Sequence, residues 1–159
     1  MLRTRVPLAL FSLLIFSLLI TACTAGVSPQ AGATYEGELT IQQIGTTGRA
    51  LGGTIRITLT EDGTGIAELA YTLQGDVCKN QGLTVTGTGA TLRQDPPPPV
   101  EEGRFAWLSD GVRAEGTFVA RDQAEGTITL AMEKQVQSGG ETVTLACDFG
   151  TWAWTAEAE

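Results

Sequence analysis

Residues 114–129 read AEGTFVARDQAEGTIT, a stretch in which one short pattern occurs twice. If Phe118 and Ile128 both face the core, antiparallel pairing of the two copies requires an odd number of loop residues, and a turn around 121–123 provides it. The stretch therefore predicts a β-hairpin. Gly116 and Gly126 would face inward, where another backbone or a large side chain lies close. The repeat is too short to be a solenoid unit.

The same alternation of apolar and polar residues extends from Thr34 to about Ala156, and no window of useful length has a helical period. Strands with one apolar face and one polar face are typical of antiparallel sheets. Turn signals separate them, for example EDGTG at 61–65 and GDVCKNQG at 75–82. The sequence predicts an all-β domain over 34–157: a single antiparallel β-sandwich of about eight or nine strands, with a small closed β-barrel as the alternative.

The first 22 residues have the layout of a secretory signal peptide. Arg3 and Arg5 precede an apolar run over 6–20, and small residues follow it. The run is shorter than the roughly 20 apolar residues that span a bilayer. We expect residues 1–22 to be removed from the mature protein.

The end of this segment, Ile20-Thr21-Ala22-Cys23, resembles the lipobox of bacterial lipoproteins. The resemblance implies cleavage before Cys23, attachment of a diacylglyceryl group to its sulfur and acylation of the new amino terminus. Several acyl chains give the stable membrane attachment that one chain does not. A plain signal peptide in which Cys23 is incidental, or an uncleaved anchor helix, would be the alternatives.

Residues 24–33, TAGVSPQAGA, are small and turn-prone, so we expect 23–33 to be a lipidated terminus and flexible tether. The domain would then lie outside the cytoplasm, held at the cell membrane or the outer membrane. Its GTF strand at 116–118 and its final strand with Cys147 and GTWAW at 150–154 are similar to small domains of uncharacterised bacterial lipoproteins. That resemblance implies no activity and transfers no site residue.

With Cys23 assigned to lipid, two of the three cysteines remain, Cys78 and Cys147. Thiols outside the cytoplasm can oxidise, so we predict that these two form a disulfide. Closing a loop of about 70 residues would stabilise the fold by roughly 4 kcal/mol on the chain-entropy model. Two cysteines without histidine do not make a tetrahedral zinc site, and we expect neither a metal nor a cofactor.

The charge and the missing residue types exclude several classes of function. The chain has 18 acidic and ten basic residues, and loss of Arg3 and Arg5 with the leader leaves eight basic ones. Such an acidic protein is not expected to bind nucleic acid. The complete absence of histidine removes Ser-His and Cys-His catalysis. We therefore expect a protein that is not an enzyme, acting as a binding or structural module.

Two stretches leave alternatives open. The sequence QDPPPPVEEG at 94–103 is either a rigid connector or a recognition loop. Trp152 and Trp154 share one face of a strand. Strict alternation would place them on the face opposite to the inward Phe149, so they face inward only if Gly150-Thr151 shifts the alternation by one residue. Facing inward they belong to the core; facing outward they would form a ligand-binding platform for sugar rings, as in a carbohydrate-binding module. A barrel that binds a small apolar ligand is the third hypothesis.

Overall fold

The computed structural model describes residues 26–75, 77–80, 82–86, 89–109 and 111–159, and its regular elements are all β-strands. They are β1 (Thr34–Ile44), β2 (Gly48–Arg49), β3 (Gly52–Leu59), β4 (Ile66–Gln74), β5 (Val77–Asn80), β6 (Leu83–Thr86), β7 (Gly89–Leu92), β8 (Arg104–Ser109), β9 (Val112–Ala120), β10 (Gln123–Ser138) and β11 (Glu141–Ala158). In these ranges no helix is long and apolar enough to cross a bilayer. The all-β class predicted from the alternation is confirmed.

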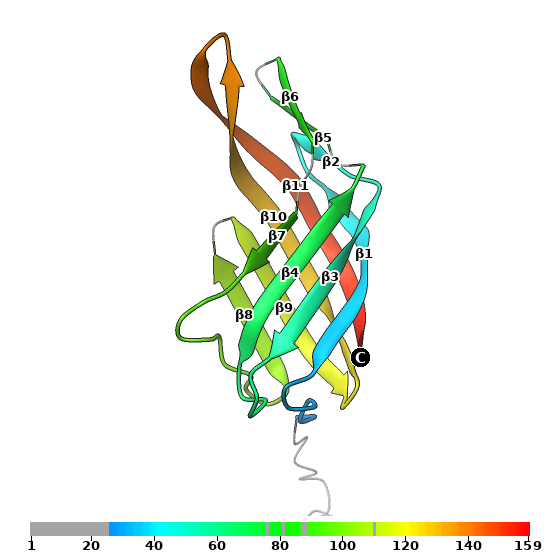
Figure 1. The fold of residues 1–159 in the computed structure, drawn as a ribbon. Coiled ribbons are helices and arrows are strands. Elements are labelled where there is room, and N and C mark those ends of the chain that lie inside the picture. The colour runs from blue at the N-terminus through cyan, green and yellow to red at the C-terminus, as the bar shows by residue number, and fades with distance from the viewer. Residues whose placement is uncertain (1–25, 76, 81, 87–88, 110) are drawn as a thin grey trace, which may run out of the picture.

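Eight strands form one antiparallel sheet in the order β7-β4-β3-β1-β11-β10-β9-β8, and β2, β5 and β6 form a small second sheet. The large sheet curls, so that the half with β4, β3 and β1 lies across the half with β10, β9 and β8 (Figure 1). It is nearly closed, with β7 and β8 at its two edges. The architecture thus lies between the predicted sandwich and its barrel alternative: one curled sheet whose two halves enclose one core.

The core is filled by large side chains from both halves of the sheet. Aromatic rings occupy its centre: Phe105 stacks on Trp154 with ring centroids 6.1 Å apart, and Phe118 meets Tyr35 edge to face at 5.1 Å. Inward residues of β3 and β4, among them Ile57 and Leu69, belong to the same core and are fully buried. Packed aromatic and aliphatic side chains, rather than an open lumen, hold the two halves together.

The hairpin predicted from the repeated pattern is β9–β10. The hairpin and the inward parity of Phe118 and Ile128 are confirmed. The register differs from a simple turn over 121–123: Ala120 pairs with Gln123, and after a shift between Gln123 and Ala124, Phe118 pairs with Ala124 and Gly116 with Gly126. A side chain at either glycine would collide with its neighbours: a Cβ on Gly116 would lie 2.8 Å from Trp154, and one on Gly126 would lie 2.6 Å from the same ring. The prediction of inward glycines under a large side chain is confirmed.

The proline-rich segment connects the two edges of the sheet, because it runs from β7 to β8. On the way it passes the start of β4, where the Ile66 amide donates to the Pro98 carbonyl and the Val100 amide donates to the Thr64 carbonyl, both at 2.8 Å. Pro98 is buried. These bonds favour the rigid connector over the recognition loop.

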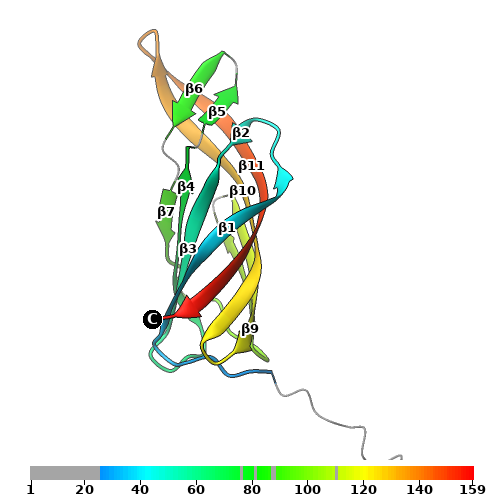
Figure 2. The same cartoon turned by 90° about the vertical axis from the view of Figure 1, so that its right-hand side faces the viewer.

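The ends of β10 and β11 leave the body of the domain as a long hairpin, residues 131–148, which we call the arm. Pairing of β10 with β9 stops at Leu130, and pairing of β11 with β1 stops at Gly150, so the arm strands pair only with each other. The arm projects beyond the large sheet next to the β5–β6 hairpin (Figure 2). The fold therefore has a body and an arm at one end of it.

Candidate functional site

The predicted disulfide joins the arm to the β5–β6 hairpin. Cys78 and Cys147 are bonded, with their Cα atoms 5.6 Å apart, and each residue is 1% exposed. Cys147 faces inward in phase with Leu145 and Phe149, as the alternation predicted. The disulfide prediction is confirmed, and the bridge lies where the arm leaves the body.

Hydrogen bonds support the bridge on both sides. The Ala146 carbonyl accepts from Asn80 Nδ2 at 3.0 Å and from Thr47 Oγ1 at 3.1 Å, and the Lys79 amide donates to the Thr47 carbonyl at 3.0 Å. The sequence GDVCKNQG, predicted as a turn between strands, contains β5 instead. Two of its residues bind neighbouring segments: Asn80 binds the arm through its side chain, and Lys79 binds Thr47 through its amide.

Asp148 fixes segment 45–49 to the place where the arm joins the body. Its carboxylate accepts from the Thr46 amide at 3.0 Å, the Thr46 hydroxyl at 2.9 Å and the Gly150 amide at 2.9 Å. The bond from the Thr46 amide is the main cause that holds the pKa of Asp148 below its usual value; partial burial opposes it, and the Arg49 charge adds to it. The aspartate is therefore ionised in its structural role at neutral pH.

Trp152 and Trp154 lie in the core, 1% and 2% exposed. An exposed stacking platform at these two residues, which the carbohydrate-binding hypothesis needs, is therefore wrong. The cause is a β-bulge: Leu130 pairs with Gly150 and Ala131 pairs with Asp148, which leaves Phe149 as an extra residue. Gly150 has φ +79°, a conformation that glycine adopts without strain. The extra residue shifts the alternation by one position, so Phe149, Trp152 and Trp154 all face inward although the strand does not turn.

The indole nitrogens of the core differ in their hydrogen bonding. Trp152 Nε1 donates to the Phe149 carbonyl at 3.1 Å. Trp107 Nε1 and Trp154 Nε1 are buried without a hydrogen-bond partner in the described part of the chain. Of the three indoles, Trp152 alone has a hydrogen-bond partner among the described residues. For Trp107 and Trp154, ring packing has to offset the cost of the unpaired donor.

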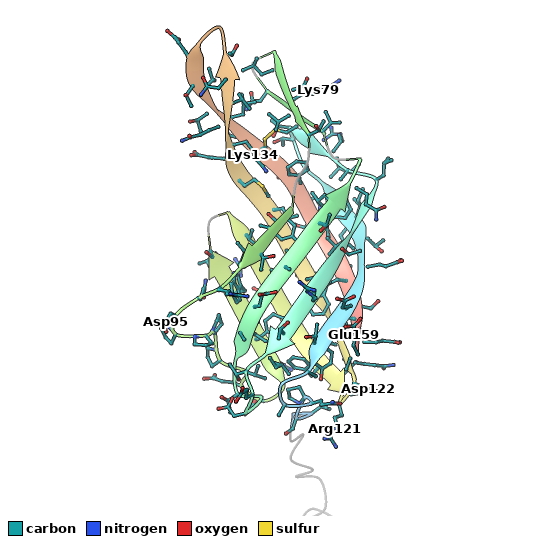
Figure 3. The ribbon with its side chains drawn as sticks, viewed as in Figure 1. Lys79, Asp95, Arg121, Asp122, Lys134 and Glu159 are labelled. Atoms are coloured by element: carbon teal, nitrogen blue, oxygen red, sulfur yellow. A yellow bond between two sulfur atoms is a disulfide. The ribbon has the colours of Figure 1, made fainter. Side chains whose placement is uncertain are left out.

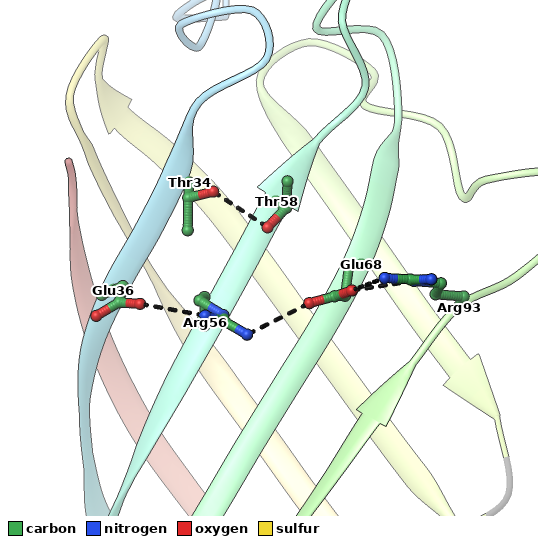
Figure 4. A network of polar contacts seen from close by, with 6 residues as sticks. All are labelled: Thr34, Glu36, Arg56, Thr58, Glu68 and Arg93. Atoms are coloured by element: carbon green, nitrogen blue, oxygen red, sulfur yellow. Dashed lines mark hydrogen bonds and ion pairs between the residues drawn. The ribbon is translucent and has the colours of Figure 1, made fainter.

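Most carboxylates of the described ranges are exposed to solvent. Only Glu68 and Asp148 are partly buried there, and the other carboxylates are exposed. Glu68 accepts from Arg93 at 2.6 and 3.0 Å and lies 3.6 Å from Arg56, which also reaches Glu36 at 3.8 Å (Figure 4). These ion pairs link β1, β3 and β4 on the outer face of the sheet. Within the same ranges, no group of His, Cys, Asp and Glu could hold a metal.

A depression of about 1090 Å³ lies on the outer surface of the sheet. It is floored by β8, β9 and β10, and its lining includes Glu101, Arg104, Glu115 and Glu125. Arg113 Nη2 lies 2.6 Å from Glu115 beside it. Its lining combines charged and apolar groups and is open to solvent, so it differs from the enclosed apolar lumen that the apolar-ligand hypothesis requires.

The proposed anchor, Cys23, lies outside the described residues. The tether predicted over 23–33 is partly ordered, because residues 26–33 pack on the body. The Gly32 amide donates to the Thr60 carbonyl at 2.9 Å, and the Gln30 amide donates to the Arg121 carbonyl at 3.2 Å. Residues 26–33 of the predicted tether therefore lie along the body and are bonded to it through their backbone. The composition of the segment indicated turns, but it did not reveal the carbonyl groups that these turns meet.

No protein-family model matches this chain, and neither does any curated protein or solved structure.

Proposed function

We propose that the chain is a bacterial lipoprotein anchored through Cys23, with its domain outside the cytoplasm as a non-catalytic binding or structural module of the envelope or surface. The observation that carries the proposal is the disulfide between Cys78 and Cys147. Disulfides persist in oxidising compartments and are rare in the cytosol. The bridge uses two of the three cysteines and leaves Cys23 after the Ile20-Thr21-Ala22 triplet, where a lipobox requires its thiol.

Two features support a role without catalysis. The sequence contains no histidine, the side chain most often used for proton transfer near neutral pH. Among the described carboxylates, the two that are partly buried already have structural partners: Glu68 binds Arg93, and Asp148 binds Thr46. A structural role accounts for both without a reaction.

The proposal is tested by the intact mass of the full chain, expressed in a bacterium and extracted from its membranes. We expect a chain that begins at Cys23 and carries the diacylglyceryl group and an additional amino-terminal acyl chain. Without reduction, the denatured protein should have no thiol that reacts with a maleimide. The matched control is Cys23→Ala, which should lose the lipid and leave the membrane fraction or retain its leader. An unmodified Cys23 in a mature chain would refute the proposal.

A further inference from the structure

We propose that residues 26–33, here called the strap, hold one end of the domain against the bilayer surface and direct the arm away from it. This inference rests on the lipid anchor proposed above. The surface concerned, here called the base, comprises the strap, the turn at 60–65, the loop at 97–103 and the β9–β10 turn at 121–122. The partner is the headgroup layer of the membrane that holds the anchor.

The strap is attached to the base by a buried tyrosine. Tyr35 is fully buried, and its hydroxyl donates to the Arg121 carbonyl at 2.5 Å. The Gln30 amide donates to the same hydroxyl at 3.0 Å and to the same carbonyl at 3.2 Å. Next to it, the Leu59 amide donates to the Ala33 carbonyl at 3.0 Å. The Tyr35 hydroxyl thus joins the strap to the β9–β10 turn, which is 86 residues away in sequence.

The other end of the strap lies against the loop that precedes β8. A Cβ on Gly103 would be 2.6 Å from the Val27 carbonyl oxygen, and a Cβ on Gly26 would collide with the Glu102 carbonyl. Gly103 also has φ +73°, which favours glycine. The strap therefore contacts the body at both ends. Val27 can lie this close to the loop because Gly103 has no side chain.

Seating at Gly26 leaves only residues 23–25 between the acylated sulfur and the body. Three extended residues reach about 10 Å, so the base cannot leave the headgroup layer. The arm lies at the opposite end: Arg121 and Asp122 mark the base in Figure 3, and Lys79 and Lys134 lie toward the arm. Because β10 has 16 residues and runs between the two ends, they are about 50 Å apart.

Energy transfer to an acceptor-labelled lipid tests this orientation. The lipidated full chain is reconstituted in phosphatidylcholine vesicles after labelling at Asp122→Cys in the base or at Gln137→Cys in the arm; both positions are exposed. The dye pair should have a Förster distance shorter than the length of β10. Energy transfer to the labelled lipid should then be several-fold more efficient from position 122 than from position 137. Equal efficiencies would overturn the inference.

Two further measurements separate the strap from the anchor. Hydrogen exchange on the same protein should show the amides of Gln30, Gly32 and Ala33 protected by about 100-fold or more. Tyr35→Phe keeps the ring and removes the hydroxyl, so protection at Gln30 should fall about ten-fold and the transfer difference should shrink. The matched control Tyr71→Phe, on β4, should change neither. Absent protection in the native chain would refute the strap.

The outcomes distinguish this inference from the proposed function. A chain without lipid that fails to float with the vesicles contradicts the anchor and therefore the orientation as well. A lipidated chain with equal transfer from both positions leaves the anchor standing and contradicts the strap. A Gly-Ser linker of about 12 residues inserted after Ala25 should abolish the transfer difference and leave the strap protection intact, because only the reach of the anchor changes.

Discussion

Removing the disulfide should lower the stability of the whole domain, although the bridge lies at its arm end. The bond links residues 69 positions apart, and the enclosed loop contains five strands, β6 to β10. Loop-closure entropy for this length gives about 4 kcal/mol at 25 °C. For a folded domain of this size, that corresponds to a fall in Tm of about 14 °C. The variant to measure is Cys78→Ala with Cys147→Ala.

Urea unfolding followed by tryptophan fluorescence gives the free energy. We expect a lower midpoint together with a larger m value, because the unfolded chain without the bridge exposes more surface. The wild type with reductant present throughout is the matched control and should agree with the double variant. A loss below about 1 kcal/mol, with a single cooperative transition, would refute the loop-entropy reasoning for this domain. It would mean that the unfolded chain holds the two positions together without the bond.

Three further predictions concern the core and the arm junction. Gly126→Ala places a methyl group 2.0 Å from the Glu115 carbonyl oxygen and 2.6 Å from Trp154, so it should cost about 3 kcal/mol or more in urea unfolding; Gly52→Ala, with nothing within 4 Å, should be nearly neutral, and equal costs would contradict the glycine argument. The lowered pKa of Asp148 means that its contribution is present above the unfolded pKa of about 4 and is lost as the pH falls through the folded value. Asp148→Asn should therefore destabilise the domain at pH 6 but progressively less below pH 4, and a difference independent of pH would sink this explanation. All three tryptophans, Trp107, Trp152 and Trp154, are at most 2% exposed, so acrylamide should quench the native protein several-fold less than the unfolded one; similar quenching would show that the core is open.

The sequence was sufficient for the features that depend on local alternation. The β9–β10 hairpin follows from the repeat around the turn, and Gly116 and Gly126 face the core as parity required. The Cys78–Cys147 pairing followed from the number of cysteines once Cys23 was set aside. In each case the information lies within a few residues or in a simple count, and tertiary contacts did not change it.

Other features depend on partners that alternation does not name. Gly150 looked like a turn between two strands, yet β11 continues through it as a bulge because β1 and β10 pair with it on both sides. Ile41 continues the alternation of Tyr35 and Leu39, but it is 40% exposed because β3 pairs with β1 only as far as Leu39. The alternation likewise did not predict the hydrogen bonds of the Tyr35 hydroxyl, because its partners, Gln30 and Arg121, lie outside β1.

The chain order of the sheet has a consequence for biosynthesis. The last of the described strands in chain order, β11, is a central one, between β1 and β10, and pairs Ala158 with Tyr35 at the opposite end of the domain. Before it emerges, β1 and β10 have no neighbour on their facing sides, and such distant pairing forms slowly. We therefore expect the nascent polypeptide to stay open until β11 has been synthesised. That delay would suit the export proposed above, because an extended chain can pass through a narrow channel.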